Sequence, residues 1–210
     1  MKKIYLNFLI LCFLLFILTE SLKNLINFND LYLNSLAENL TANQIKNIFE
    51  VQKKWEWISY TIIPLLLLIK TSIVTSILYI GTFFYSKTEV TFKNIFNSAI
   101  KCEFVFLIIP ILKIIWFYFF QTNYTLEDIQ YFFPLSALNI TGYQGVDPWL
   151  IYPLQVLNLF EVAYIIYLSY QIGYLTKTNA DTGLKIVAYS YVPALLLWVT
   201  VVMFFTLNYS

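Results

Sequence analysis

The sequence predicts an all-α, polytopic transmembrane helix bundle, and two observations carry this prediction. Hydrophobic residues make up 60% of the 210 residues and charged residues only 12%, whereas soluble domains average roughly 25% charged residues. Several windows also hold about 20 predominantly apolar residues, the length that crosses a hydrocarbon core of roughly 30 Å. We therefore expect residues 1–210 to form a single integral membrane domain.

Five stretches of the chain are apolar for long enough to be spans. They cover residues 4–18, 58–85, 95–120, 149–175 and 184–207. The first has the lysines and short apolar run of a signal peptide, but residues 19–21 offer no small-x-small cleavage site, so we interpret it as an uncleaved anchor. Each later span contains a proline, which removes a backbone hydrogen bond and can bend the helix: Pro64, Pro110, Pro153 and Pro193.

The distribution of lysines predicts the orientation, because cytoplasmic loops carry the excess of positive charge. Lysines precede the first span and flank or occupy both short loops: Lys2, Lys3, Lys87, Lys93, Lys177 and Lys185. The long loop 121–148 has three acids and no lysine, and segment 19–56 mixes its lysines with acids. We expect the N-terminus inside and the C-terminus outside.

Two helices are expected outside the spans, both on the outer side. Thr41 and Gln44 have the spacing of a capping box, which predicts an amphipathic helix from about Ala42 to Trp55 that runs into the second span. Thr125 is a second helix start, and Pro134 is the expected end. This second helix is either an interfacial lid or partner-docking surface, or part of a loop tucked onto the bundle.

Five ionisable residues fall within the expected spans: Lys70, Lys101, Glu103, Lys113 and Glu161. Each costs about 2.5–3.5 kcal/mol at the centre of a membrane helix, so partners or water are expected around them. Lys101 and Glu103 are expected about one or two turns from the inner end of the third span, where a lysine can extend to the interface.

The other three charges are expected at similar depth. Lys70 and Glu161 each lie roughly 18–20 Å from the outer ends of their spans, and Lys113 lies close to that level. We therefore predict an ion pair of Glu161 with Lys70 or Lys113. Gln155 and Asn158 precede Glu161 at steps of three residues, so they are expected to share its inward face.

Two interpretations of this polar set stay open. The charges can neutralise one another and fix how the helices pack. Alternatively, they line a polar cavity that passes a proton, an ion or a polar solute. In that case Glu161 is the group with the depth and chemistry to carry a proton.

Several function classes are excluded by missing residues. The chain has no histidine and no arginine, which excludes histidine-based acid–base chemistry and guanidinium clamps for phosphate. Motifs for phosphate loops, zinc hydrolases and serine hydrolases are also absent. The net charge of only +1 argues against a nucleic-acid partner. Because these residues and motifs are missing, we also expect no catalytic residue, no metal and no cofactor.

Two segments show a short inner loop followed by a span with a proline near its middle. They are "TFKNIFNSAIKCEFVFLIIPILKIIWF" (residues 91–117) and "TGLKIVAYSYVPALLLWVTVVMFF" (residues 182–205). In this pattern and in its topology, the chain resembles the Yip domain family of five-span membrane proteins. The resemblance implies a five-span fold with the N-terminus inside, and a scaffolding or accessory role.

We therefore expect a non-catalytic component or scaffold of a membrane assembly, with the lipid bilayer and other membrane proteins as partners. The alternative is a small transporter, or a permease subunit beside an ATPase, that uses the polar residues near the membrane midplane. The arginine-free, asparagine- and lysine-rich composition is typical of an AT-rich bacterial genome, so we expect the bacterial cytoplasmic membrane.

Overall fold

A computed structural model of the chain describes residues 2–37, 40–86 and 88–209. Over these residues the chain forms α-helices, one 3-10 helix and no strand. In chain order the elements are α1 (Lys2–Leu25), α2 (Phe28–Ala37), α3 (Ala42–Tyr85), α4 (Phe92–Glu103), η1 (Phe104–Leu107), α5 (Ile108–Phe119), α6 (Leu126–Tyr131), α7 (Ala137–Thr141), α8 (Pro148–Val156), α9 (Leu159–Leu175) and α10 (Ala180–Tyr209). The all-α class predicted from the sequence is confirmed.

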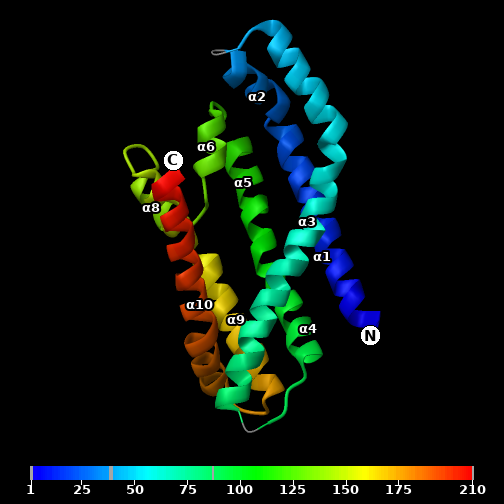
Figure 1. Ribbon diagram of the computed structural model, residues 1–210, viewed down its shortest axis with the longest axis vertical. Coiled ribbons are helices and arrows are strands. Elements are labelled where there is room, and N and C mark those ends of the chain that lie inside the picture. Colours follow the sequence, from blue (N-terminus) through cyan, green and yellow to red (C-terminus); the bar gives the residue numbers. More distant parts are fainter. Residues whose placement is uncertain (1, 38–39, 87, 210) are drawn as a thin grey trace.

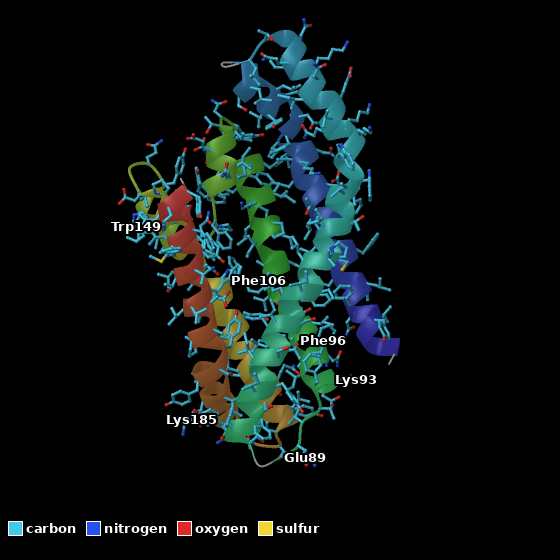
Figure 2. The ribbon with its side chains drawn as sticks, in the orientation of Figure 1. Glu89, Lys93, Phe96, Phe106, Trp149 and Lys185 are labelled. Atoms are coloured by element: carbon cyan, nitrogen blue, oxygen red, sulfur yellow. The ribbon has the colours of Figure 1, made fainter. Side chains whose placement is uncertain are left out.

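Among the described residues, four helices are long and apolar enough to cross a membrane. They cover Tyr5–Leu25, Tyr60–Tyr85, Phe92–Phe119 and Ala180–Tyr209. They run along the long axis of the molecule (Figure 1), with both short loops at the lower end, the N-terminus in the lower half and the C-terminus in the upper half. Glu89, Lys93 and Lys185 lie at the end with the short loops (Figure 2).

This arrangement places the expected inner segments together, but which end faces the cytoplasm stays a prediction, and "inner" and "outer" below name the expected sides only. Lys87, one of the lysines behind that prediction, lies outside the described residues, as do the side chains of Lys2 and Lys3.

The expected span 149–175 is not one helix. It is divided into α8 and α9, and Asn158 between them has extended backbone (φ −137°, ψ 160°). The outer loop supplies the hydrogen bonds that the break leaves open. The Ala137 N–H donates to the carbonyl oxygen of Leu157 at 2.8 Å, and the Leu159 N–H donates to that of Leu135 at 3.2 Å. Such pairing is required of non-helical backbone at membrane depth, since lipid offers no partner.

Helix α3 is one continuous helix from the outer segment through the second span. It begins as predicted at Ala42, where the Gln44 side chain accepts a hydrogen bond from the Thr41 N–H at 3.0 Å, and it continues past Pro64. Its 44 residues are about 66 Å long, whereas its apolar part begins only at Tyr60. The first part therefore projects beyond the apolar zone, beside α2 and the end of α1 (Figure 1).

Helix α6 also begins where the sequence predicted. The Thr125 N–H donates to the Asp128 carboxylate at 2.8 Å, and the Tyr143 hydroxyl donates to it at 2.9 Å. Burial would raise the pKa of Asp128, but these hydrogen bonds outweigh it and lower the pKa below its ordinary value. The helix ends at Tyr131, before Pro134. Ile129 packs in a buried cluster with Ile26 and Phe117, so this segment is tucked onto the bundle.

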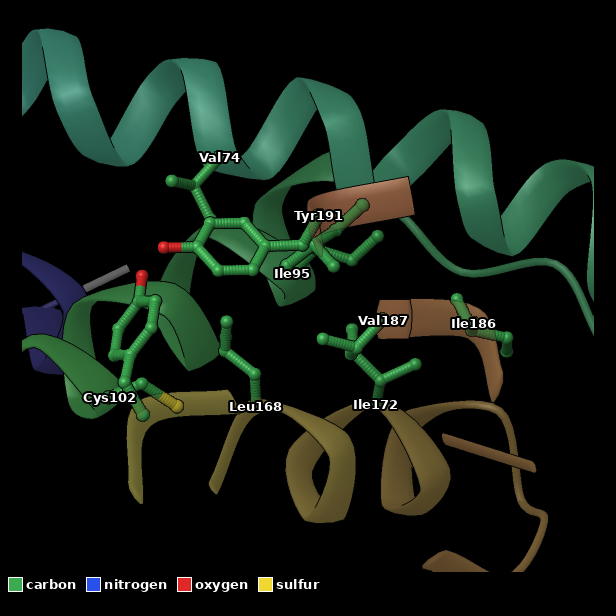
Figure 3. Close-up of a cluster of buried hydrophobic side chains, with 10 residues drawn as sticks. Val74, Ile95, Cys102, Leu168, Ile172, Ile186, Val187 and Tyr191 are labelled. Atoms are coloured by element: carbon green, nitrogen blue, oxygen red, sulfur yellow. The ribbon is translucent and has the colours of Figure 1, made fainter. Parts of the chain in front are cut away.

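The main core lies between α3, α4, α9 and α10 (Figure 3). Its buried members come from all four helices: Val74, Leu78, Ile95, Cys102, Tyr164, Leu168, Ile172, Ile186, Val187 and Tyr191. Helices α9 and α10 approach closely because Gly173 and Gly183 have no side chain. A Cβ at Gly173 would lie 2.7 Å from the carbonyl oxygen of Asn179.

Candidate functional site

The third span changes helix type in its middle, and this positions a carboxylate inside the bundle. Helix α4 ends at Glu103, a 3-10 turn follows over Phe104–Leu107, and α5 begins at Ile108. Pro110 has no N–H for the carbonyl of Phe106 and its ring crowds that carbonyl, so a regular helix is disfavoured just before it. Glu103 is 4% exposed at this junction.

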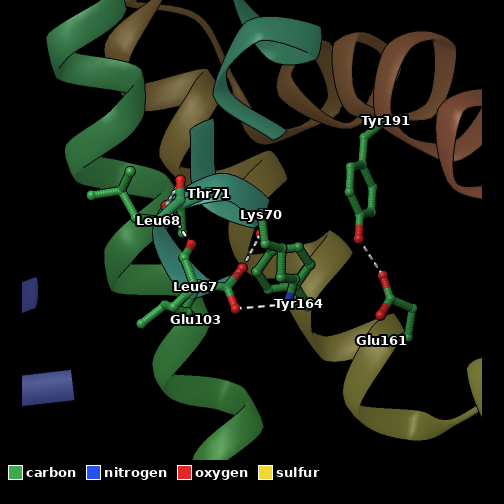
Figure 4. Close-up of polar contacts among 8 residues, drawn as sticks. All are labelled: Leu67, Leu68, Lys70, Thr71, Glu103, Glu161, Tyr164 and Tyr191. Carbon is green, nitrogen blue, oxygen red and sulfur yellow. Dashed lines mark hydrogen bonds and ion pairs between the residues drawn. The ribbon is translucent and has the colours of Figure 1, made fainter. Parts of the chain in front are cut away.

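Both oxygens of Glu103 have partners from other helices. The Lys70 Nζ of α3 lies 2.7 Å from Oε2, and the Tyr164 hydroxyl of α9 donates to Oε1 at 2.9 Å. The same ammonium lies 4.0 Å from the centre of the Phe106 ring, within the range of a cation–π interaction. One carboxylate thus links three helices (Figure 4).

A second carboxylate lies on the other side of Tyr164. Glu161 is one turn earlier on α9, and its Oε1 accepts a hydrogen bond from the Tyr191 hydroxyl of α10 at 2.6 Å. The rings of Tyr164 and Tyr191 meet edge to face, with centroids 5.6 Å apart. We call Lys70, Glu103, Tyr164, Tyr191 and Glu161 the polar cluster.

The predicted ion pair of Glu161 with Lys70 or Lys113 is wrong. Lys70 binds Glu103 because α3 and α4 form a hairpin whose short loop brings the two residues to matching height. Lys70 lies about 22 Å along α3 from Tyr85, and Glu103 lies about 16 Å along α4 from Phe92. The expectation that Glu103 lies one or two turns from the inner end is also wrong, because α4 starts at Phe92 and Glu103 is about three turns along it.

The other predicted residues lie outside the polar cluster. The Lys113 Nζ donates to the carbonyl oxygen of Ile129 at 3.2 Å, near the outer loop. Lys101 is partly buried on α4. The Gln155 amide lies 3.4 Å from the carbonyl oxygen of Tyr131. Gln155 and Asn158 do not share a helical face with Glu161, since the helix is interrupted between them.

The Asn158 side chain stabilises the break between α8 and α9 by hydrogen bonds to the backbone on both sides. Its side-chain oxygen accepts from the Glu161 N–H at 2.8 Å, while its amide donates to the carbonyl oxygens of Gln155 at 2.8 Å and Val156 at 3.0 Å. It is therefore the N-cap of α9 and also satisfies the end of α8.

We expect Asn158→Ala to lower the free energy of unfolding by about 2 kcal/mol, the upper range for losing an N-cap. Asn158→Ser keeps a capping oxygen but loses the amide donor, so we expect a smaller loss. Thermal unfolding of the purified variants, followed by tryptophan fluorescence, measures both. Wild-type stability of the alanine variant would contradict the capping role.

Sequence reasoning missed Tyr164, Tyr191 and Phe106. A signal for Tyr164 was present, because it follows Glu161 by three residues and so shares its side of a helix. Nothing in the sequence alone pairs Tyr191 of α10 with Glu161. Among the described residues, no group of three acidic or cysteine side chains could hold a metal ion.

The polar cluster joins helices α3, α4, α9 and α10 through charged and polar side chains, and we call it a charged junction. It can hold helices together, and its carboxyl and hydroxyl groups can bind protons. Two clefts near the outer end, of about 460 Å³ beside Trp55 and about 170 Å³ beside Tyr143, are lined by other residues.

The fold and the polar cluster define a class, a helical integral membrane protein with a charged junction inside its bundle. Four apolar helices carry that assignment. No protein-family model, curated protein or solved structure matches the chain. The resemblance to the Yip domain family stays a prediction.

Proposed function

We propose that the protein is a non-catalytic component or scaffold of a membrane assembly, in the bacterial cytoplasmic membrane. One observation carries the proposal. The Lys70 side chain is 45% exposed on the surface of the bundle, at about the middle depth of the apolar part of α3. Its ammonium is paired with Glu103, but the exposed side of this pair lies at a depth where a charge costs about 2.5–3.5 kcal/mol, so a partner helix that covers the pair would gain stability.

The surroundings of Lys70 support a helical partner. Leu66, Ile69 and Ile73 are also exposed on α3, so the exposed part of the Lys70 side chain lies among apolar side chains. Helix α1 is more open, with 6% of its apolar span buried inside the fold, compared with 28% for the span of α3. Much of the apolar surface is therefore free for contacts with lipid or with other membrane proteins. A scaffolding role is also what the Yip resemblance implies.

Co-purification tests this proposal. The chain is extracted from its native membrane in a mild detergent, and partners are identified by mass spectrometry. We expect a stoichiometric membrane partner with the wild type. Ile73→Trp should reduce its recovery at least about tenfold, which corresponds to about 1.4 kcal/mol.

Ile166→Trp is the matched control, because Ile166 is 61% exposed and Ile73 54% exposed, on different helices. It should retain the partner. Purification of the wild type without any stoichiometric partner would contradict the proposal, as would equal loss in both variants.

A second candidate function is a small transporter or a permease subunit that works with an ATPase. The observation that favours it is the interruption at Asn158, because discontinuous membrane helices are typical of transporter binding sites. In this case the co-purifying partner would be an ATPase, and the polar cluster would take part in solute passage.

A further inference from the structure

The polar cluster contains two carboxyl groups and one ammonium group. The ammonium of Lys70 lies 2.7 Å from Glu103, and Glu103 receives a second hydrogen bond from Tyr164. Glu161 has the Tyr191 hydroxyl as its partner at 2.6 Å, and a hydroxyl brings no charge. With both carboxyl groups ionised, the cluster would therefore hold a net charge of −1 inside the bundle.

The depth of Glu161 makes this charge unfavourable. Glu161 is hydrogen-bonded to Tyr191, which lies about 16 Å along the apolar helix Ala180–Tyr209 and so near the middle of a hydrocarbon core of about 30 Å. An acid at the centre of a membrane helix costs about 2.5–3.5 kcal/mol.

Three effects act in the opposite direction. The Tyr191 hydroxyl donates to the carboxyl group, and Lys70 is a nearby positive charge, although Glu103 opposes its effect. Glu161 is also in the first turn of α9, where the helix dipole stabilises a negative charge by about 0.3–1 kcal/mol. The cost of removing the carboxylate from water is the largest effect, so the neutral form is favoured.

A proton satisfies the site better than a metal cation. Hard cations such as Ca²⁺ take about six to eight oxygen ligands. At Glu161 the fold brings one hydroxyl, which donates to Oε1, and a proton on the other oxygen completes a neutral carboxyl group without further ligands.

We propose that Glu161 is an intramembrane proton-binding site, a carboxylic acid at neutral pH that forms a hydrogen-bonded pair with Tyr191. The ionisable groups that face this pair are Lys70 from α3, Glu103 from α4, Tyr164 from α9 and Tyr152 from α8. Lys70 is the cation among them, and it is bound to Glu103. The proposal does not depend on whether a partner covers Lys70.

The break between α8 and α9 places polar groups and the outer loop next to Glu161. Asn158 caps α9 immediately before Glu161, and the outer loop pairs with the backbone there. Glu161 itself is only partly buried. The proton therefore has polar groups and the outer loop on one side, and the Tyr164 ring and Glu103 on the other.

Infrared spectroscopy of the full chain in lipid vesicles tests the proposal. A protonated carboxyl group has a C=O stretching band that a carboxylate lacks, and the band shifts in D₂O. We expect this band at neutral pH in the wild type and its loss in Glu161→Gln. Glu127→Gln, which removes an exposed acid of the outer loop, should leave it unchanged.

Tyr191→Phe is the second variant, and it keeps the acid itself. Loss of the hydroxyl should move the band to a higher frequency, because the C=O group loses a hydrogen bond. A merely structural role of Tyr191 would not move it. Absence of the band in the wild type would overturn the proposal, as would a band that persists in Glu161→Gln or keeps its frequency in Tyr191→Phe.

Discussion

Gly183→Ala is expected to destabilise the fold strongly, although it adds a single methyl group. The new Cβ would overlap the carbonyl oxygen of Ser169 and lie 2.8 Å from the backbone nitrogen of Gly173. Both atoms belong to the backbone of α9, which cannot rotate away as a side chain can. Helices α9 and α10 must then separate along their shared core.

The size of this effect follows from the overlap. Overpacking inside a core typically costs about 1–3 kcal/mol and sometimes more, and contact with a fixed backbone belongs at the upper end. A stability of about 5–15 kcal/mol is typical of native proteins, so the loss is a large share. Alanine is otherwise the better helix former by about 1 kcal/mol. A loss of stability in Gly183→Ala would therefore come from the overlap and not from helix propensity.

Size-exclusion chromatography and thermal unfolding in detergent measure the outcome. Ala188→Val is the control, because Ala188 is exposed on the same helix and the added methyl groups meet no backbone. We expect it to behave as the wild type. Equal unfolding temperatures for Gly183→Ala and the wild type would show that α9 and α10 do not approach as closely as described.

Local sequence signals predicted the helices well. The pairs Thr41–Gln44 and Thr125–Asp128 begin α3 and α6 as expected, because a capping box depends on residues three apart in the chain. Long apolar windows likewise identified the membrane class. These features need no knowledge of tertiary contacts.

The sequence did not predict the features that depend on tertiary contacts. Asn158 interrupts the expected span because its side chain caps α9 and the outer loop pairs with the exposed backbone. A hydropathy window records only that the segment is apolar. The same window gave Glu161 a depth on an unbroken helix, which the structure does not contain.

The partner of Lys70 was missed for a different reason. Depth was estimated from the outer end of each span, where the helix boundaries were least certain. Counting from the short loop between α3 and α4 would have placed Lys70 and Glu103 at similar height, since a tight hairpin fixes the register of both helices. The tyrosines that complete the polar cluster, Tyr164 and Tyr191, come from α9 and α10 and have no local signal.

The pair of Lys70 and Glu103 gives the second large effect. Glu103→Gln is nearly isosteric and retains an oxygen for the Tyr164 hydroxyl, but it leaves the Lys70 ammonium unpaired at mid-depth. We expect it to lower the free energy of unfolding by about 3 kcal/mol, within the range for breaking a buried ion pair by removing one partner. The double variant Lys70→Met/Glu103→Gln has no charge to compensate, so it should regain most of that loss.

A double-mutant cycle with Lys70→Met isolates the interaction between the two side chains. The outer pair of Lys23 and Glu20 is the control. Its atoms are 3.2 Å apart, and its side chains are 35% and 28% exposed, so Glu20→Gln should cost less than about 1 kcal/mol. If the double variant were as unstable as Glu103→Gln, the loss would come from packing at Glu103. The unpaired Lys70 ammonium would then not be the cause of the lower stability.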